Sequence, residues 1–104
     1  MISDDKAAEE AHNGLSDTDE QYGRGSAYVK MGPYYTKLIK AKHFLTANGT
    51  VAERDAIAYA STEFTTYVDN LREATVDLEI LEAKRESWQR EVEIWRTLSA
   101  NKRR

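Results

Sequence analysis

Cysteine is absent from this 104-residue sequence, and histidine, proline and glycine are scarce. Without cysteine the chain has no disulfide framework, no thiolate nucleophile and no cysteine zinc site. The two histidines, His12 and His43, lie far apart, and neither has a carboxylate at the spacing of a metal-binding helix. No apolar run approaches the length that spans a membrane. We therefore expect no metal site and no membrane association.

An export signal and a catalytic constellation are also missing. Residues 1–5 contain no basic segment followed by an apolar run, so we expect a cytoplasmic protein. Gly23, Arg24 and Gly25 are too few to form a phosphate-binding loop. No Ser-His-Asp or Cys-His arrangement is recognisable, so no catalytic or cofactor-binding residue can be named. We expect a protein that is not an enzyme and holds no cofactor.

Charge is distributed unevenly along the chain, whose formal net charge is -3. The first residues are rich in Asp and Glu, whereas no acidic residue occurs from Tyr22 to Ala47. The basic residues of this acid-free stretch are Arg24, Lys30, Lys37, Lys40 and Lys42. The sequence ends in Lys102, Arg103 and Arg104, so two basic zones flank a segment of mixed charge.

The chain is predicted to consist of two parts, residues 1–32 and 33–104. The first part is polar, acidic and interrupted by glycines, so we expect a flexible arm with at most a short helix before Asn13. Pro33 is favoured at the first position of a helix, and apolar residues recur behind it at a helical spacing. We expect four of them to form the core stripe of a helix that ends near Ala47: Tyr34, Leu38, Ala41 and Leu45.

A helix stop is followed at once by a helix start. Asn48 and Gly49 supply a left-handed stop, and Thr50 with Glu53 forms a Thr-x-x-Glu capping box. So short a connection predicts an αα-hairpin of two antiparallel helices.

From Val51 onward the chain has neither glycine nor proline, and its apolar residues alternate at steps of three and four. One heptad position holds Ile57, Phe64, Leu71, Leu78 and Val92, and the other holds Ala60, Tyr67, Ala74, Leu81, Trp88 and Trp95. Arg85 is the charged exception in this seam. Residues 61–66 have low helix propensity and are the place where a bend would occur. The sequence thus predicts an all-α fold: an αα-hairpin with a long heptad-patterned C-terminal helix and a flexible N-terminal arm.

The expected hairpin partner is too short to cover the whole seam, so its later part needs another chain or the arm. Because leaving large apolar side chains in water is costly, we expect a homo-oligomer. The predicted interface residues are Leu71, Leu78, Leu81, Arg85, Trp88, Val92 and Trp95. Arg85 would then fix the register through a carboxylate such as Glu82 or Glu86 of a neighbouring chain.

The basic stretch also carries aromatic side chains, a combination that suits a phosphate backbone and unpaired bases. The candidate nucleic-acid contacts are Lys37, Lys40, Lys42, Lys102, Arg103 and Arg104. In the simpler alternative these cations are the solvated face of a helix whose core stripe begins at Tyr34.

Two segments carry a resemblance to a known group of proteins. Residues 46–54, TANGTVAER, and residues 94–101, IWRTLSAN, resemble the turn and tail of small uncharacterised helical proteins encoded by tailed phages. The similarity covers about the last two-thirds of the chain. Such proteins often accompany early genes for recombination or replication. The resemblance implies a phage origin, the host cytoplasm as location and an accessory role, with no catalytic residues.

Two functional hypotheses follow. The first is a non-enzymatic, oligomeric helical accessory protein linked to nucleic-acid recombination or replication, with DNA as a partner. The alternative is a structural or adaptor coiled coil that binds another protein, for example as an inhibitor of a host factor, with no nucleic-acid contact.

Overall fold

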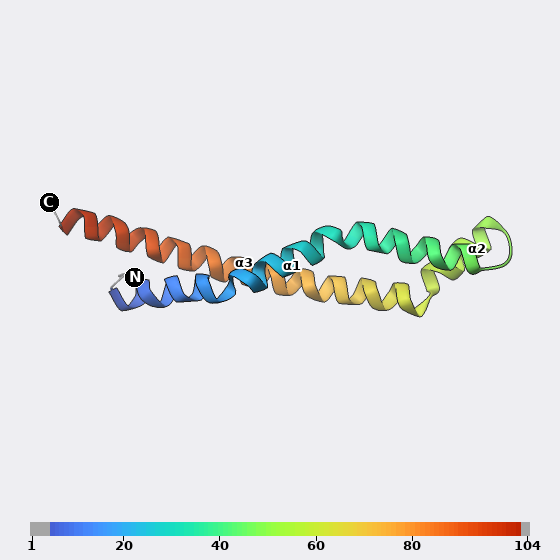
Figure 1. Ribbon diagram of the computed structural model, residues 1–104, viewed down its shortest axis with the longest axis horizontal. Coiled ribbons are helices and arrows are strands. Elements are labelled where there is room, and N and C mark those ends of the chain that lie inside the picture. The colour runs from blue at the N-terminus through green and yellow to red at the C-terminus, as the bar shows by residue number, and fades with distance from the viewer. Residues whose placement is uncertain (1–4, 103–104) are drawn as a thin grey trace. The chain divides into compact units, whose positions relative to one another are not determined.

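The computed structural model describes residues 5–102, and its elements are three helices (Figure 1). Helix α1 is Asp5–Thr46, α2 is Val51–Ala60 and α3 is Thr62–Lys102, and residues 5–102 include no strand. The predicted all-α fold, a helical hairpin with a long heptad-patterned C-terminal helix, is confirmed.

Contacts divide the chain into two compact units. The first joins the chain up to Arg24 with the chain from Leu78 onward, and the second is Gly25–Asp77. Both units contain part of α1 and part of α3. They do not coincide with the predicted parts 1–32 and 33–104, and each is described separately below.

Helix α1 begins much earlier than the sequence predicted. A start at Pro33 is wrong, because α1 begins at Asp5 and Pro33 lies inside it. Residues 5–32, predicted as a flexible arm, are the N-terminal part of this helix. Pro33 removes one backbone donor, but it is exposed, and the Thr36 hydroxyl donates to its carbonyl at 2.9 Å. Packing against α3 within each unit outweighs the local propensity of the Gly and Pro residues.

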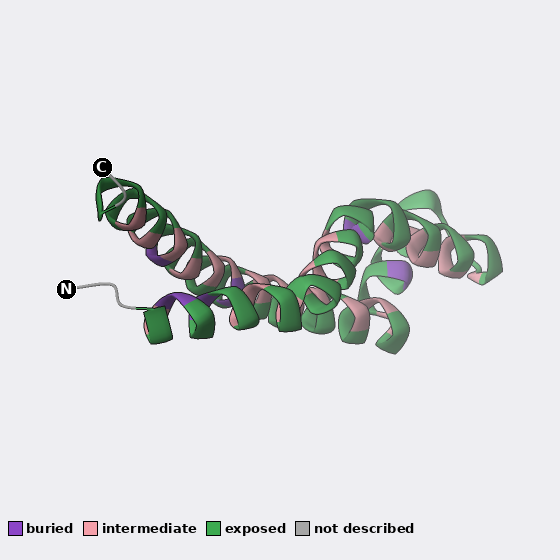
Figure 2. Ribbon diagram, turned by 60° about the vertical axis from the view of Figure 1, so that its left-hand side comes forward, coloured by how far each residue is buried: buried purple, intermediate pink, exposed green. Residues whose placement is uncertain are grey.

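In the first unit α1 turns small side chains toward α3. Ala8 and Ala11 are buried, with Ala11 only 2% exposed, and Leu81 of α3 is buried as well. A Cβ added to Gly14 would lie 2.6 Å from the Trp88 ring, so this glycine gives the indole its space. Figure 2 shows buried positions as short bands on helices that are otherwise largely exposed or half-buried. The unit is a helix pair in which large side chains of α3 pack against small ones of α1.

In the second unit the later part of α1 packs on the beginning of α3. A Cβ added to Gly32 would lie 2.7 Å from the Leu71 side chain. Tyr67 of α3 contacts two α1 rings, with ring centroids 5.9 Å from Tyr28 and 6.2 Å from Tyr35. The same small-against-large packing therefore recurs here, beside an aromatic cluster.

The turn between α1 and α2 follows the predicted signals. Gly49 has a φ of 119°, which favours glycine. The Thr50 Oγ1 accepts from the Glu53 N–H at 3.2 Å and donates to the Glu53 carboxylate at 3.1 Å. Arg54 then donates to the Phe44 carbonyl at 3.1 Å and stacks 4.2 Å from the Phe44 ring. These contacts hold α2 against the end of α1.

Ser61 separates α2 from α3, within the region where a bend was expected. Its φ of -62° and ψ of 143° are extended rather than helical. The Ser61 Oγ accepts from the Phe64 N–H at 3.2 Å and donates to the Ala58 carbonyl at 2.9 Å. One serine thus ends α2 and caps α3.

Candidate functional site

The residues predicted to form an oligomer interface are largely turned toward α1 of the same chain. Leu71 lies against Gly32, Trp88 lies against Gly14, and the Trp95 Nε1 donates to Asp5 at 2.6 Å. Leu81 is buried, and Leu78 and Val92 are half-buried. The later part of the seam was predicted to need either another chain or the N-terminal arm. In the structure the arm, as part of α1, packs on the seam. Self-association stays a prediction. The reason given for it, an apolar seam left uncovered within one chain, does not apply to this structure.

Arg85 is matched within the chain rather than by a glutamate of a neighbouring one. Its guanidinium donates to the Leu15 carbonyl at 2.9 Å and to the Thr18 hydroxyl at 2.7 Å. It also forms an ion pair with Asp19 at 2.7 Å, and its side chain is only 14% exposed. The charged exception in the heptad seam is therefore bound by three residues on one face of α1.

Lys40, one of the predicted phosphate contacts, is bound by α2. Its Nζ donates to the Tyr59 hydroxyl at 2.8 Å, lies 4.1 Å from the centre of the Tyr59 ring and is 3.8 Å from Asp55. The hydrogen bond to Tyr59 raises the pKa of Lys40, against the opposing effect of burial, and the Asp55 charge raises it further. Lys40 is a cation already satisfied by its neighbours.

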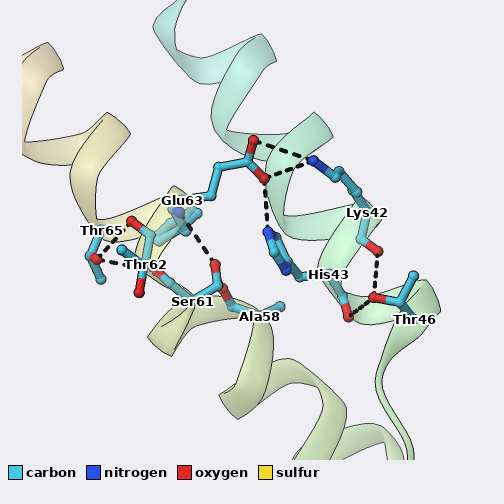
Figure 3. Close-up of polar contacts among 9 residues, drawn as sticks. Lys42, His43, Thr46, Ala58, Ser61, Thr62, Glu63 and Thr65 are labelled. Carbon is cyan, nitrogen blue, oxygen red and sulfur yellow. Dashed lines mark hydrogen bonds and ion pairs between the residues drawn. The ribbon is translucent and has the colours of Figure 1, made fainter.

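Lys42 is likewise paired with an acid (Figure 3). Its Nζ donates to the Glu63 carboxylate at 3.0 Å, and His43 Nε2 lies 2.8 Å from the same oxygen. The hydrogen bond from Lys42, followed by that with His43, lowers the pKa of Glu63. The start of α3 therefore neutralises the end of the basic stretch.

The remaining predicted contacts are differently placed. Lys37 is exposed, as is Lys30, which lies seven residues earlier in the same acid-free stretch. Neither lysine makes an ion pair or hydrogen bond with residues 5–102. Lys102 is exposed at the end of α3 in the other unit, whereas Arg103 and Arg104 lie outside the described residues. Of the six predicted phosphate contacts, only Lys37, Lys40 and Lys42 are thus found in the second unit.

The predicted core stripe of α1 is on the outside of the molecule. Tyr34 is 55% exposed, Leu38 47% and Leu45 74%, so the prediction that they form the hairpin core is wrong. Met31, one helical step earlier, is 43% exposed and extends the stripe. We call these exposed residues the α1 stripe: Met31, Tyr34, Leu38, Ala41 and Leu45.

A different face of α1 packs on α3. In the second unit its less exposed residues recur at steps of three and four: Val29, Gly32, Thr36, Ile39 and His43. This face was not predicted from the sequence, because glycine, threonine and histidine do not count as apolar in a periodicity pattern. The regular spacing of small and β-branched residues was the only signal that could have revealed it.

The described part of the chain contains no group of three or more His, Asp or Glu side chains that could hold a metal ion. A hollow beside His12 is also lined by Asp5, Glu9 and Trp95, and Asp5 is already the acceptor for the indole of Trp95. None of the described helices is both long and apolar enough to cross a membrane.

The fold and its surfaces define an antiparallel helical-hairpin protein that exposes an apolar stripe beside unpaired lysines. No protein-family model matches the chain, and neither a curated protein nor a solved structure shows significant similarity to it.

Proposed function

We propose that this protein is a non-enzymatic helical adaptor that binds another protein through the α1 stripe. The observation that carries the proposal is the exposure of Tyr34, Leu38 and Leu45, which lie on one face of α1 at intervals of four and seven residues. Contiguous exposed apolar surface on a small protein is typical of interaction sites. A helix that already packs its opposite face on α3 is a rigid support for such a site.

The pairing of the lysines favours this proposal over nucleic-acid binding. Lys40 and Lys42 are bound to Asp55 and Glu63, so a phosphate would have to displace a carboxylate at each. Binding energy for nucleic acid comes mainly from cations that are free to replace counterions. Of the three predicted phosphate contacts in the second unit, Lys40 and Lys42 do not meet that condition.

A nucleic-acid accessory role is the second candidate, and a specific observation favours it. Lys30 and Lys37 are exposed, and Tyr34 and Tyr35 beside them expose rings on which bases can stack. This role agrees with the resemblance to phage proteins found beside recombination and replication genes, which itself stays a prediction.

The two candidates are separated by two measurements. Fluorescence anisotropy with single-stranded and duplex DNA across a salt series is expected to show no binding above nonspecific levels. A photo-crosslinking amino acid at Leu38 is expected to capture a defined protein in a cell extract, whereas the same group at Ser87 on α3 is not. Salt-sensitive DNA binding that disappears in a Lys30→Ala, Lys37→Ala variant would favour the accessory role.

A further inference from the structure

The α1 stripe has the dimensions of a helix-docking surface. Met31, Leu38 and Leu45 repeat at seven-residue intervals, and Tyr34 and Ala41 lie between them. Steps of three and four over two heptads form one straight seam of about 20 Å along the helix. The residues that face α3, such as Gly32 and Ile39, belong to the other side of α1. The stripe is therefore free along its whole length to receive a second amphipathic helix.

One edge of the stripe carries unpaired positive charge. Lys30 and Lys37 immediately precede Met31 and Leu38, so they flank one edge. Lys42 flanks the other edge, where it is bound to Glu63. The sequence has no acidic residue from position 22 to 47, so α1 itself supplies no counter-charge to Lys30 or Lys37.

This charge pattern selects against a second copy of α1. In an antiparallel pair of these helices the same edge meets itself, which brings Lys37 and Lys30 of one chain toward those of the other. In a parallel pair Lys37 meets Lys42, whose charge Glu63 already offsets, so Lys37 finds no free carboxylate there either. Like charges at these flanking positions destabilise a coiled coil and opposite charges stabilise it, so the complementary helix carries Asp or Glu there.

We propose that the α1 stripe docks an amphipathic helix whose apolar seam is flanked by acidic residues. This rests on the proposed adaptor function and specifies its partner. The apolar residues of the partner would pack on Tyr34 and Leu38. Its carboxylates would pair with Lys30 and Lys37, which supplies orientation and faster association.

The test uses the full chain and two labelled peptides of about three heptads, with identical leucine seams. One peptide has Glu at the flanking positions and the other has Lys. In fluorescence anisotropy at low salt the Glu peptide is expected to bind at least about tenfold more tightly, and added salt should reduce the difference.

Matched variants locate the site. Leu38→Asp is expected to abolish binding, whereas Val76→Asp, at a slightly more exposed apolar position on α3, is expected to leave it unchanged. Lys37→Glu should weaken binding of the Glu peptide by about twofold to fivefold, and Lys84→Glu should not. Circular dichroism on each variant checks that the helices are retained.

Several outcomes would overturn the proposal. Equal binding of both peptides, lost in Leu38→Asp, would leave the adaptor function intact but remove the acidic partner. Binding of neither peptide, with crosslinking from Leu38 retained, would reject an acidic amphipathic helix as the occupant. A single-stranded oligonucleotide bound through Lys37, or a dimer dissociated by Leu38→Asp, would assign the stripe to nucleic acid or to a second copy. If the protein bound neither peptide and gave no crosslink from Leu38, the adaptor function itself would be rejected.

Discussion

The Arg85 guanidinium and the Asp19 carboxylate lie 2.7 Å apart, joining the middle of the α3 seam to α1. The same guanidinium donates to the Leu15 carbonyl and the Thr18 hydroxyl. An arginine in a seam position is costly when it is unpaired, and here both terminal nitrogens of the guanidinium donate to acceptors on α1. Because these acceptors occupy one turn of α1, the arrangement also fixes the register of the two helices in this unit.

Replacing Arg85 by Ala is therefore expected to lower the free energy of unfolding by about 1 to 3 kcal/mol, since charge-assisted bonds and packing are lost together. Urea denaturation followed by circular dichroism measures the change. Arg72→Ala is the control, because its ion pair with Asp69 is exposed and should contribute less than about 0.5 kcal/mol. Equal effects of the two substitutions would argue against a special role for Arg85.

Tyr67 offers the opposite case, a buried hydroxyl without a hydrogen-bond partner among the described residues. Burial, reinforced by Tyr28 and Tyr35, raises the pKa of Tyr67. Tyr67→Phe removes the unsatisfied group and keeps the ring, so it is expected to raise the free energy of unfolding by about 1 kcal/mol. Tyr59→Phe, which loses the bond from Lys40, should bring no gain in the same urea titration. A loss of stability in Tyr67→Phe would mean that the hydroxyl has a partner.

Three glycines of α1 should respond differently to alanine. Gly23 has open space around it, so Gly23→Ala is expected to stabilise the helix by up to about 1 kcal/mol. Gly14→Ala would bring a Cβ within 2.6 Å of the Trp88 ring and should lower the melting temperature instead. In Gly32→Ala the added Cβ would contact the Leu71 side chain, which can adapt more easily than an indole. The melting temperature of this variant should therefore lie between those of the other two. Differential scanning calorimetry compares the three, and an equal gain in all would contradict the close packing of Gly14.

The pH dependence of stability should report on Glu63. Lys42 and His43 lower the pKa of Glu63 below its ordinary value of 4.5, so folding favours the ionised carboxylate. Its stabilising effect is present above the unfolded pKa and is lost as the pH falls through the folded one. Glu63→Gln is thus expected to lose stability near neutral pH and to show a shallower decline below about pH 4.5. Thermal melts from pH 3 to 7 test this prediction, and an unchanged slope would reject it.

The elements that the sequence predicts correctly are those with local signals. Gly49 and Thr50 defined the turn between the first two helices, because a positive φ and an N-cap each depend on few residues. The alternation of large apolar residues along α3 also identified its packed face, since Leu81 and Trp88 are large enough to reveal the period. These signals were sufficient for an all-α hairpin.

The partner face of α1 was not predictable in the same way. Ala8, Gly14 and Gly32 accommodate large neighbours by being small, and hydropathy does not distinguish that role from a loop. The apolar stripe at Tyr34 and Leu38 competed with this face and was mistaken for the core. Which of two helical faces is buried depends on the shape of the partner helix, which periodicity alone does not contain.

The pairing of Gly14 with Trp88 makes the two sides of this hairpin mutually dependent in evolution. A larger residue at position 14 leaves no room for an indole, and a smaller residue at position 88 leaves a void beside glycine. Related chains should therefore change both positions together, exchanging volume across the helix pair. Such compensating substitutions would identify distant relatives even where the surrounding surface residues have diverged.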